Sequence, residues 1–261
     1  RIIDDPQTGC MEIFELSYKN LTDYLKACFL YLAVFQEYKE IPVQKLTWLW
    51  MAEGFIQEKN SKSLEDLAED YLIDLIGRSL ITVAKRRSDG GVKYCRLHHL
   101  VRALCLLKAK KENFLEFITS DDKPYASFDD DLDLEEFEPS YPLNYDGYRL
   151  SISTRRNHFV MSTPSGSYVR TLLFFATGDT YPRCPYDISF ISRNFKLLKV
   201  LDLECINMGN LFAAGIDLLL HLIYLAVGGD IDCIPSSLAN LRNLESFLVK
   251  GLKGKVILPD A

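Results

Sequence analysis

The clearest pattern of apolar and polar positions in the chain runs over residues 28–56. Residues 28–35 are apolar on every side, as expected for a helix end that is buried in a core. A polar connection over 36–40 leads to Pro42, which fits the first turn of a second helix because its missing N–H is not needed there. Gly54 then ends that helix. The apolar face of the helix consists of Val43, Leu46, Leu49 and Trp50.

Two further apolar patterns with helical spacing lie on either side of this segment. The first runs over 11–32 and the second over 63–79. The second has a start signal, because Ser63 and Asp66 have the spacing of a capping box. Residues 1–9 show no such pattern and predict a loose lead-in.

The hydrophobic period changes after the helix at 63–79. The stretches 80–84 and 92–97 are typical of strands, and the polar turn between them ends in Asp89-Gly90-Gly91, which predicts a β-hairpin. A closing helix is expected from 98 to about 111. Three helices followed by a hairpin is the topology of a winged helix. The sequence therefore predicts a mainly helical winged-helix domain over 10–118.

Residues 119–149 differ from the rest of the chain in composition. They contain ten acidic and two basic residues, a net charge of −8, together with Pro124, Pro139 and Pro142. Such a run predicts a solvated, flexible linker, and it supplies the whole of the chain's net charge of −6. Docking on a basic patch of a partner or of a neighbouring domain is the alternative interpretation.

An imperfect L-x-x-L-x-L repeat follows the acidic segment. Its four frames start at Val169, Leu198, Leu222 and Leu244, so the starts are 29, 24 and 22 residues apart. This spacing is typical of leucine-rich repeats, in which each repeat adds a short strand and buries its apolar side only against its neighbours. Residues 150–261 therefore predict an α/β leucine-rich-repeat solenoid, truncated at its end, and the whole chain an α+β multidomain protein.

Composition narrows the class of protein. Apolar residues make up 48% and charged residues 25% of the 261-residue chain, which is ordinary for globular proteins and fits about two domains. The seven cysteines form no C-x-x-C pair and lie in apolar segments, so they predict reduced thiols of an intracellular protein. No apolar run approaches the roughly 18–20 residues that span a bilayer, so no transmembrane segment is expected.

The residue types over 28–56 carry a resemblance to a known family. The string Cys-Phe-Leu-Tyr, followed by Leu-Thr-Trp-Leu-Trp-Met-Ala-Glu-Gly-Phe-Ile, closely resembles the winged-helix signature of plant nucleotide-binding leucine-rich-repeat (NB-ARC-LRR) disease-resistance proteins of the coiled-coil, non-TIR class. Leu16-Ser17-Tyr18 and the string at 25–29 match the opening of that domain, although Thr22 stands where the family often has proline. The resemblance implies that 10–118 is the ARC2-like domain of a fragment, and that the nucleotide-binding domain lies upstream of Arg1.

The resemblance also points to a nucleotide-binding residue. Leu97-His98-His99 stands where the family has a Met-His-Asp motif, whose histidine contacts the β-phosphate of ADP in the resting state. That role carries over to His98, and a strand-to-helix corner is a natural place to meet phosphate. Without the resemblance, a histidine there is usually a packing or capping residue. Leu97 is a tolerable replacement, but His99 removes a carboxylate that the helix dipole favours, so we expect a weaker hold on ADP or compensation elsewhere.

Other chemistries find little support in the sequence. The nearest approach to a P-loop, at 249–256, lacks the first glycine and the final Ser or Thr. Cys95, His98, His99 and Cys105 could suggest zinc, but a strand residue and a residue about two helical turns past the histidines would not converge tetrahedrally. We therefore predict no metal site, no catalytic residue and no enzyme activity in this fragment.

Some winged helices bind DNA, which gives one alternative function. The helix that would enter the groove, at 63–79, carries five acidic residues against Arg78, so phosphate repulsion opposes DNA binding. Lys85, Arg86 and Arg87 in the hairpin are read most simply as a solvated turn. The alternative for them is a contact with the nucleotide-binding domain or the acidic linker.

The resemblance implies a two-state immune receptor. With ADP bound, His98 helps to hold the winged helix against the nucleotide-binding domain, and the repeats restrain it. Pathogen perception then leads to exchange of ADP for ATP, rotation of the winged helix, oligomerisation and defence, including hypersensitive cell death. ADP or ATP with Mg²⁺ is expected only in the intact protein.

The implied partners are the protein's own NB-ARC and coiled-coil domains, and a pathogen effector or guarded host protein bound by the repeats. The expected location is the cytoplasm, with peripheral membrane association as an option. A leucine-rich-repeat scaffold that does not switch is the second alternative function. Nucleotide-dependent change in the full-length protein separates that scaffold from the receptor, and DNA binding at physiological salt would support the DNA-binding alternative.

Overall fold

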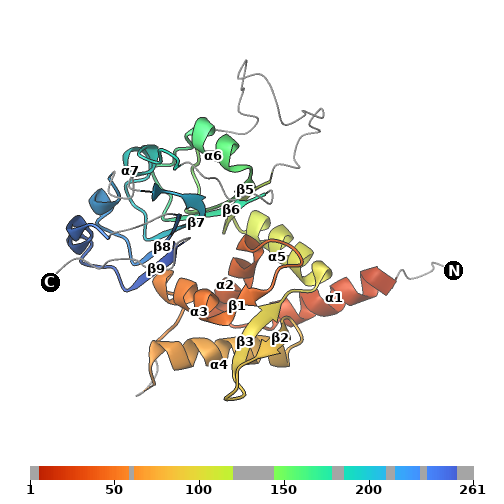
Figure 1. Cartoon of the computed structure of the whole chain (residues 1–261). Helices are drawn as coiled ribbons and strands as arrows, with labels where there is room; N and C mark the ends of the chain where they lie inside the picture. Colours follow the sequence, from red (N-terminus) through yellow and green to blue (C-terminus); the bar gives the residue numbers. More distant parts are fainter. Residues whose placement is uncertain are drawn as a thin grey trace. The chain divides into compact units, whose positions relative to one another are not determined.

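The computed structural model divides the chain into two compact units, Arg1–Leu115 and Glu116–Ala261 (Figure 1). The residues that it describes are 6–58, 62–119, 144–177, 185–209, 215–229 and 234–251. The first unit holds a three-stranded sheet and the second a six-stranded sheet. No helix within these described ranges is both long enough and apolar enough to cross a membrane.

The first unit has the predicted order of helices, hairpin and closing helix. Its helices are α1 (Pro6–Lys19), α2 (Asp23–Tyr31), the short 3₁₀ helix η1 (Leu32–Val34), α3 (Val43–Ala52), α4 (Leu64–Gly77) and α5 (His99–Lys111). Its strands are β1 (Ile41–Pro42), β2 (Thr82–Arg86) and β3 (Val92–Arg96), paired antiparallel in the order β1-β3-β2.

The local signals of the first unit lie where the sequence places them. Every side chain over 28–35 is buried, with at most 6% of its surface exposed. Gly54 follows α3 with a φ of +76°, a conformation that side chains disfavour. Ser63 caps α4, because its hydroxyl oxygen accepts the backbone N–H of Asp66 at 3.1 Å.

Two details of the first unit differ from expectation. Helix α1 begins at Pro6, inside the region expected to be a loose lead-in, because proline suits the first turn of a helix. The pattern at 11–32 forms two helices and a 3₁₀ turn, and the break comes after Lys19.

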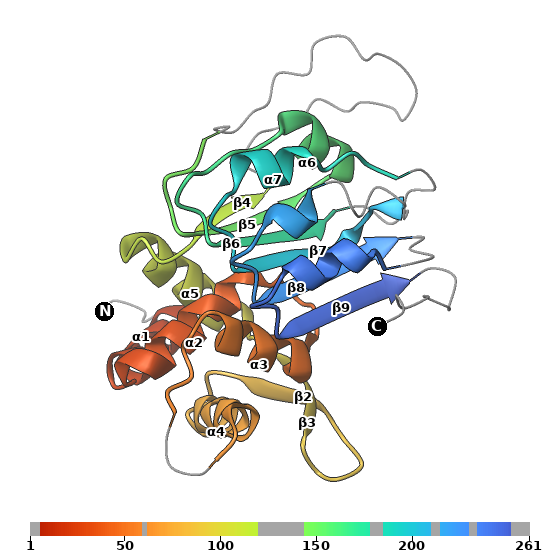
Figure 2. The ribbon, with the colours of Figure 1, turned by 90° about the vertical axis from the view of Figure 1, so that its left-hand side faces the viewer.

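The second unit is built on a parallel sheet with its strands in chain order, β4 to β9 (Figure 2). The strands are β4 (Glu116–Thr119), β5 (Arg149–Thr154), β6 (Thr171–Ala176), β7 (Val200–Asn207), β8 (Tyr224–Gly229) and β9 (Ser246–Gly251). Short helices lie between them: α6 (Arg156–Ser162), α7 (Phe190–Asn194), η4 (Ile216–Leu218) and η5 (Ser236–Asn240).

Each predicted repeat frame supplies one strand of this sheet. The matching positions pair with one another along the row Leu172, Leu201, Leu225 and Phe247. Leu150 of β5 extends the row by one strand, because it pairs with Leu172. The apolar positions thus line up across the sheet and bury one face.

A backbone pattern recurs before the strands. The carbonyl oxygen of Lys199 accepts two successive N–H groups, those of Ile223 at 2.8 Å and Tyr224 at 3.0 Å. The same pair of bonds is formed by the carbonyl oxygens of Tyr148, Arg170 and Ile223 with the next segment. Because these bonds involve only the backbone, the segments before these strands have the same backbone arrangement even where their side chains differ.

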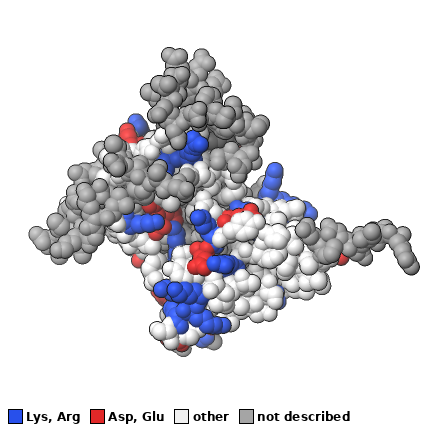
Figure 3. All heavy atoms as spheres, turned by 45° about the vertical axis from the view of Figure 1, so that its right-hand side comes forward, with Lys and Arg blue, Asp and Glu red and all other residues white. Residues whose placement is uncertain are grey.

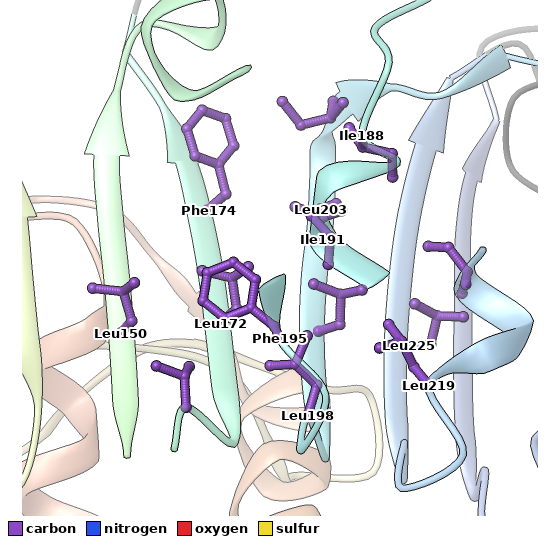
Figure 4. Packing of buried hydrophobic residues seen from close by; sticks show 14 of the residues in the cluster. Leu150, Leu172, Phe174, Ile188, Ile191, Phe195, Leu198, Leu203, Leu219 and Leu225 are labelled. Carbon is purple, nitrogen blue, oxygen red and sulfur yellow. The ribbon is translucent and has the colours of Figure 1, made fainter. Parts of the chain in front are cut away.

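The core of the second unit lies between the sheet and its short helices (Figure 4). Leu172 and Phe174 of β6 point into it together with Phe195, which follows α7. Phe159 of α6 stacks on Phe174, with ring centroids 4.4 Å apart. The core is therefore shared by successive strands and by the helices between them.

The division between the units falls slightly earlier than expected. The winged-helix domain was expected to end at 118, whereas the structure places the division after Leu115 and gives 116–119 to the second sheet as β4. Of the expected linker at 119–149, residues 120–143 lie outside the described residues, and Arg149 already belongs to β5.

The row of paired apolar residues across the sheet predicts which substitutions most reduce the stability of the second unit. Leu201 is fully buried, so Leu201→Ala should reduce the free energy of unfolding by about 2–5 kcal/mol through lost burial and a residual cavity. Leu197→Ala is the control, because Leu197 is 37% exposed and its truncation should change stability by less than about 0.5 kcal/mol. Urea unfolding measures both. Equal effects would contradict the placement of the row in the core.

Candidate functional site

The candidate motif lies at the corner between β3 and α5. Leu97 is half-buried, while His98 and His99 are exposed. His98 is the N-cap of α5, and its Nδ1 atom accepts the backbone N–H of Leu100 at 3.3 Å. The structure thus brings the three sequence-predicted residues to one surface, at the end of a helix that exposes N–H groups and the positive pole of its dipole.

The capping bond determines what His98 can offer to a ligand. Because Nδ1 of the neutral ring accepts a hydrogen bond, the proton lies on Nε2. Nε2 is therefore a donor, which suits a phosphate oxygen. The first turn of α5 contains no acidic residue, so no carboxylate of that turn competes for an anion. These features fit a phosphate group.

Phe14 adds an aromatic contact that sequence reasoning missed. The His98 and His99 rings lie 4.2 Å apart between centroids, and the Phe14 ring of α1 lies 6.4 Å from that of His98. Phe14 belongs to no motif. The spacing of apolar residues along α1 is the only signal that could have pointed to its contact with His98.

Helix α5 is held by the backbone of the apolar segment 28–35. The Arg102 guanidinium donates from Nε to the Phe35 carbonyl oxygen at 3.1 Å, and the Cys105 thiol donates to the Phe29 carbonyl oxygen at 3.4 Å. These bonds join the helix that carries His98 to the most buried part of the unit. The orientation of the corner thus depends on the core.

The cysteines near the motif are core residues. The Cys95 thiol lies 3.8 Å from the Ile41 carbonyl oxygen, and burial raises its pKa to about 12. Burial likewise raises the pKa of the Cys105 thiol. Across the described ranges, no group of three or more His, Cys, Asp or Glu residues is placed to hold a metal ion.

A polar cluster joins the far end of α5 to α1. The Lys108 side chain is buried, and its Nζ atom lies 2.7 Å from Oε1 of Glu15 and 5.7 Å from the centre of the Tyr18 ring. The Tyr18 hydroxyl donates to Glu112 at 2.7 Å. Lys108 shares the apolar stripe of α5 with Val101, and a lysine in such a stripe is the signal that could have revealed the pair.

Glu15 makes the stability of this unit depend on pH. The hydrogen bond and charge of Lys108, with a smaller effect of Lys19, hold the pKa of Glu15 below its ordinary value of 4.5. The pair therefore stabilises the fold above that pH, and the stabilisation is lost as pH falls through the lowered pKa of the folded state. Glu15→Gln should lower the melting temperature at pH 7, and the difference from wild type should shrink below about pH 4.5. Glu12→Gln, at an exposed position of the same helix, is the control, and a pH-independent difference for Glu15→Gln would contradict the pairing.

The cap at His98 predicts a second effect on stability. His98→Ala removes the acceptor for the Leu100 N–H and should cost about 0.5–2 kcal/mol, the usual range for loss of an N-cap. His98→Asn should recover most of that loss, because asparagine is a good capping residue. His99→Ala, one position later, should change stability by less than about 0.5 kcal/mol. Chemical denaturation of the chain measures all three, and identical values for Ala and Asn at 98 would count against the cap.

Comparison with known protein families assigns most of the first unit. Residues 34–105 match the family model of the disease resistance protein winged-helix domain. The matched range includes the hairpin and the His98 corner. The winged-helix domain predicted from the topology is therefore confirmed.

The curated relatives are resistance proteins of Solanum demissum. The chain is 34% identical to the putative late blight resistance protein homolog R1A-4 over 95% of its length, and 37% identical to the homolog R1B-12 over 92%. It is 35% identical to the late blight resistance protein R1-A over 95% of its length. The chain spans 17–19% of the length of these relatives. It belongs to the family of plant disease resistance proteins, as its winged-helix motif indicates.

Proposed function

We propose that the chain is the switch portion of an intracellular plant immune receptor. In this proposal, the winged helix senses whether ADP or ATP is bound to an upstream NB-ARC core. The second unit couples that state to restraint and to perception of a pathogen effector or guarded host protein. The observation that supports it best is the exposed His98 cap, whose Nδ1 accepts the Leu100 N–H, inside the range that matches the winged-helix family model.

His98 acts here as a positioning contact for a phosphate. Nε2 of His98 would donate to a phosphate oxygen of bound ADP while Nδ1 keeps the helix cap, so one ring would link the nucleotide to α5. Arg102 and Cys105 of α5 form hydrogen bonds to the 28–35 segment. A nucleotide bound at His98 would therefore be connected through α5 to the core of the winged helix. No bond of the nucleotide is broken in this step, and we propose no catalytic activity for the chain.

The second unit is proposed to be the start of a leucine-rich-repeat solenoid. Parallel strands in chain order, an apolar row in register and repeated backbone bonds before the strands support this assignment. Such a surface suits protein partners. A leucine-rich-repeat scaffold that does not switch is therefore the alternative function. Nucleotide-dependent change in the full-length protein distinguishes the two.

DNA binding is the weaker proposal because of the charges on α4. The first turn of this helix holds Glu65 and Asp66. Its cation Arg78 is paired with Asp74 at 2.7 Å. The helix therefore presents mainly negative charge, which phosphate repels.

The proposal is tested by nucleotide retention in the full-length receptor. His98→Ala should reduce the ADP that co-purifies with the protein. His99→Asp, which restores a carboxylate in the first turn of α5, should raise retention roughly two- to fivefold, as expected from about 0.3–1 kcal/mol of dipole and hydrogen-bond stabilisation. Lys110→Gln, at an exposed position in the last turn, is the control. Chromatography of the nucleotide released from each purified variant measures retention. Retention that neither histidine variant changes would refute the proposal.

A further inference from the structure

The edge of the second sheet at which the strands begin carries two rows of side chains that are exposed or half-buried. The first row consists of the residues just before β5 to β9, which the strand register aligns: Tyr148, Arg170, Lys199, Ile223 and Glu245. The second row lies two positions earlier in the last four of these segments: Tyr168, Leu197, His221 and Asn243. Between the rows the chain points inward, as Leu198 does in Figure 4, where it belongs to the core.

A pocket of about 430 Å³ lies between these rows in the last three segments. Lys199, His221 and Arg242 line it, each from a different segment, and all three are exposed. Ile223 and Leu244, both half-buried, supply the apolar part of the lining. The volume falls within the 300–1,000 Å³ that is usual for ligand pockets. The pocket therefore combines the size of a ligand site with basic side chains from three directions.

The charged groups of the pocket are available to a ligand. Among the described residues, no carboxylate lies within ion-pairing distance of Lys199 or Arg242, and Glu245 of the same lining pairs with no cation. The Asn243 side chain donates from Nδ2 to the Leu220 carbonyl oxygen at 2.9 Å, which joins two neighbouring segments at the pocket wall. An anion could thus bind without first breaking an ion pair of the described chain.

The hairpin of the first unit carries more positive charge but is a poorer anion site. Over 82–96 it has five basic residues and one acidic residue, and Lys and Arg side chains gather at the lower end of the view in Figure 3, where the hairpin lies. Arg87 is paired with Glu69 and Arg96 with Glu40, both at 2.6 Å. An anion bound there would compete with these carboxylates.

We propose that the pocket of the second unit binds the phosphate group of a phosphorylated serine or threonine in a partner protein. Such a phosphate has three terminal oxygens that accept hydrogen bonds, and it carries nearly two negative charges at neutral pH. Lys199, His221 and Arg242 come from three successive segments, so each would donate to a different oxygen. A carboxylate has two oxygens and one charge, so an acidic side chain would use this set of donors incompletely.

The surroundings of the pocket favour a peptide over a small free anion. Glu245 would repel a highly charged small anion, whereas it would attract a Lys or Arg that follows or precedes the phosphorylated residue. Neighbouring strands are about 4.8 Å apart, so Glu245 lies roughly 5–10 Å from the basic side chains, or about two to three residues of extended chain. In the other direction the rows continue with Leu197 and Tyr168, which are 37% and 58% exposed and offer apolar contacts.

The test uses two fluorescein-labelled synthetic peptides of Gly and Ser that contain one phosphoserine. One has Leu three residues before the phosphoserine and Lys two residues after it, and the other has Lys and Leu exchanged, so that both chain directions are covered. Each peptide is titrated with the 261-residue chain at physiological ionic strength, and anisotropy reports binding. At least one should bind, and its unphosphorylated form should bind at least about tenfold more weakly, the loss expected for charge-assisted hydrogen bonds.

Matched variants locate the contact. Lys199→Ala and Arg242→Ala should each weaken binding of the phosphopeptide about tenfold. Lys250→Ala and Arg193→Ala remove an exposed lysine of β9 and an exposed arginine of α7 that do not line the pocket, so binding should change by less than about twofold. Glu245→Gln should abolish the preference for the peptide with Lys over the same peptide with Gly at that position. Melting temperatures confirm that each variant is folded.

Three results would overturn the proposal. The first is binding of both phosphopeptides that is no tighter than that of their unphosphorylated forms, absence of binding included. The second is equal loss of binding in the pocket variants and the controls, which would assign binding to the overall charge of the chain. The third is binding of free phosphoserine as tight as that of the better peptide, which would assign the pocket to a small anion. No nucleotide takes part in these measurements, so their outcome is separate from that of the retention experiment.

Discussion

The first unit depends on the burial of one continuous apolar segment, residues 28–35. A helix end that is apolar on every side must be covered on every side, because each exposed apolar side chain would forfeit about 1.5–3 kcal/mol of burial. The cover includes α5, which meets this segment through the Phe29 and Phe35 carbonyl oxygens. The position of α5, and with it the candidate phosphate contact, is therefore a consequence of core packing.

The same constraint explains why the two histidines are exposed. Cys95 of β3 is fully buried, and Val101 of α5 is 1% exposed. The chain therefore leaves the core after Cys95, crosses the surface and returns to the core before Val101. His98 and His99 are exposed between them, so capping and ligand chemistry can set the identity of these two residues. His98 satisfies the first of these needs through Nδ1 and leaves Nε2 for the second.

Sequence reasoning succeeded where the cause was local. The capping serine at 63, the glycine after α3, the hairpin turn and the repeat frames act through near neighbours or a fixed period, so the pattern alone located them. It also placed Leu97, His98 and His99 at the corner, because a strand pattern gives way to a helical one there.

What the sequence left out depends on contacts between distant residues. The two-residue strand β1 exists because Ile41 pairs with Cys95, and no local signal marks it. Strand β4 joins the second sheet by pairing with β5, some thirty residues later. The change in composition at residue 119 therefore did not coincide with the division between the units. The Glu15–Lys108 pair likewise joins opposite ends of the unit. Predicting these features requires the fold itself.

Strand β3 connects the His98 corner with a groove of about 220 Å³ between α4 and the β2–β3 hairpin. Val92 at its start lines the groove, and Leu97 and His98 follow its end. The strand is paired on both edges, with β1 and with β2, and the irregular register between Val83 and Lys85 belongs to β2. A strand held on both sides has one arrangement and not two, whereas coupling between sites needs an element with two. Changes at the groove and at the His98 corner should therefore act independently on the stability of this unit. Any coupling between them has to come from motion of the unit as a whole.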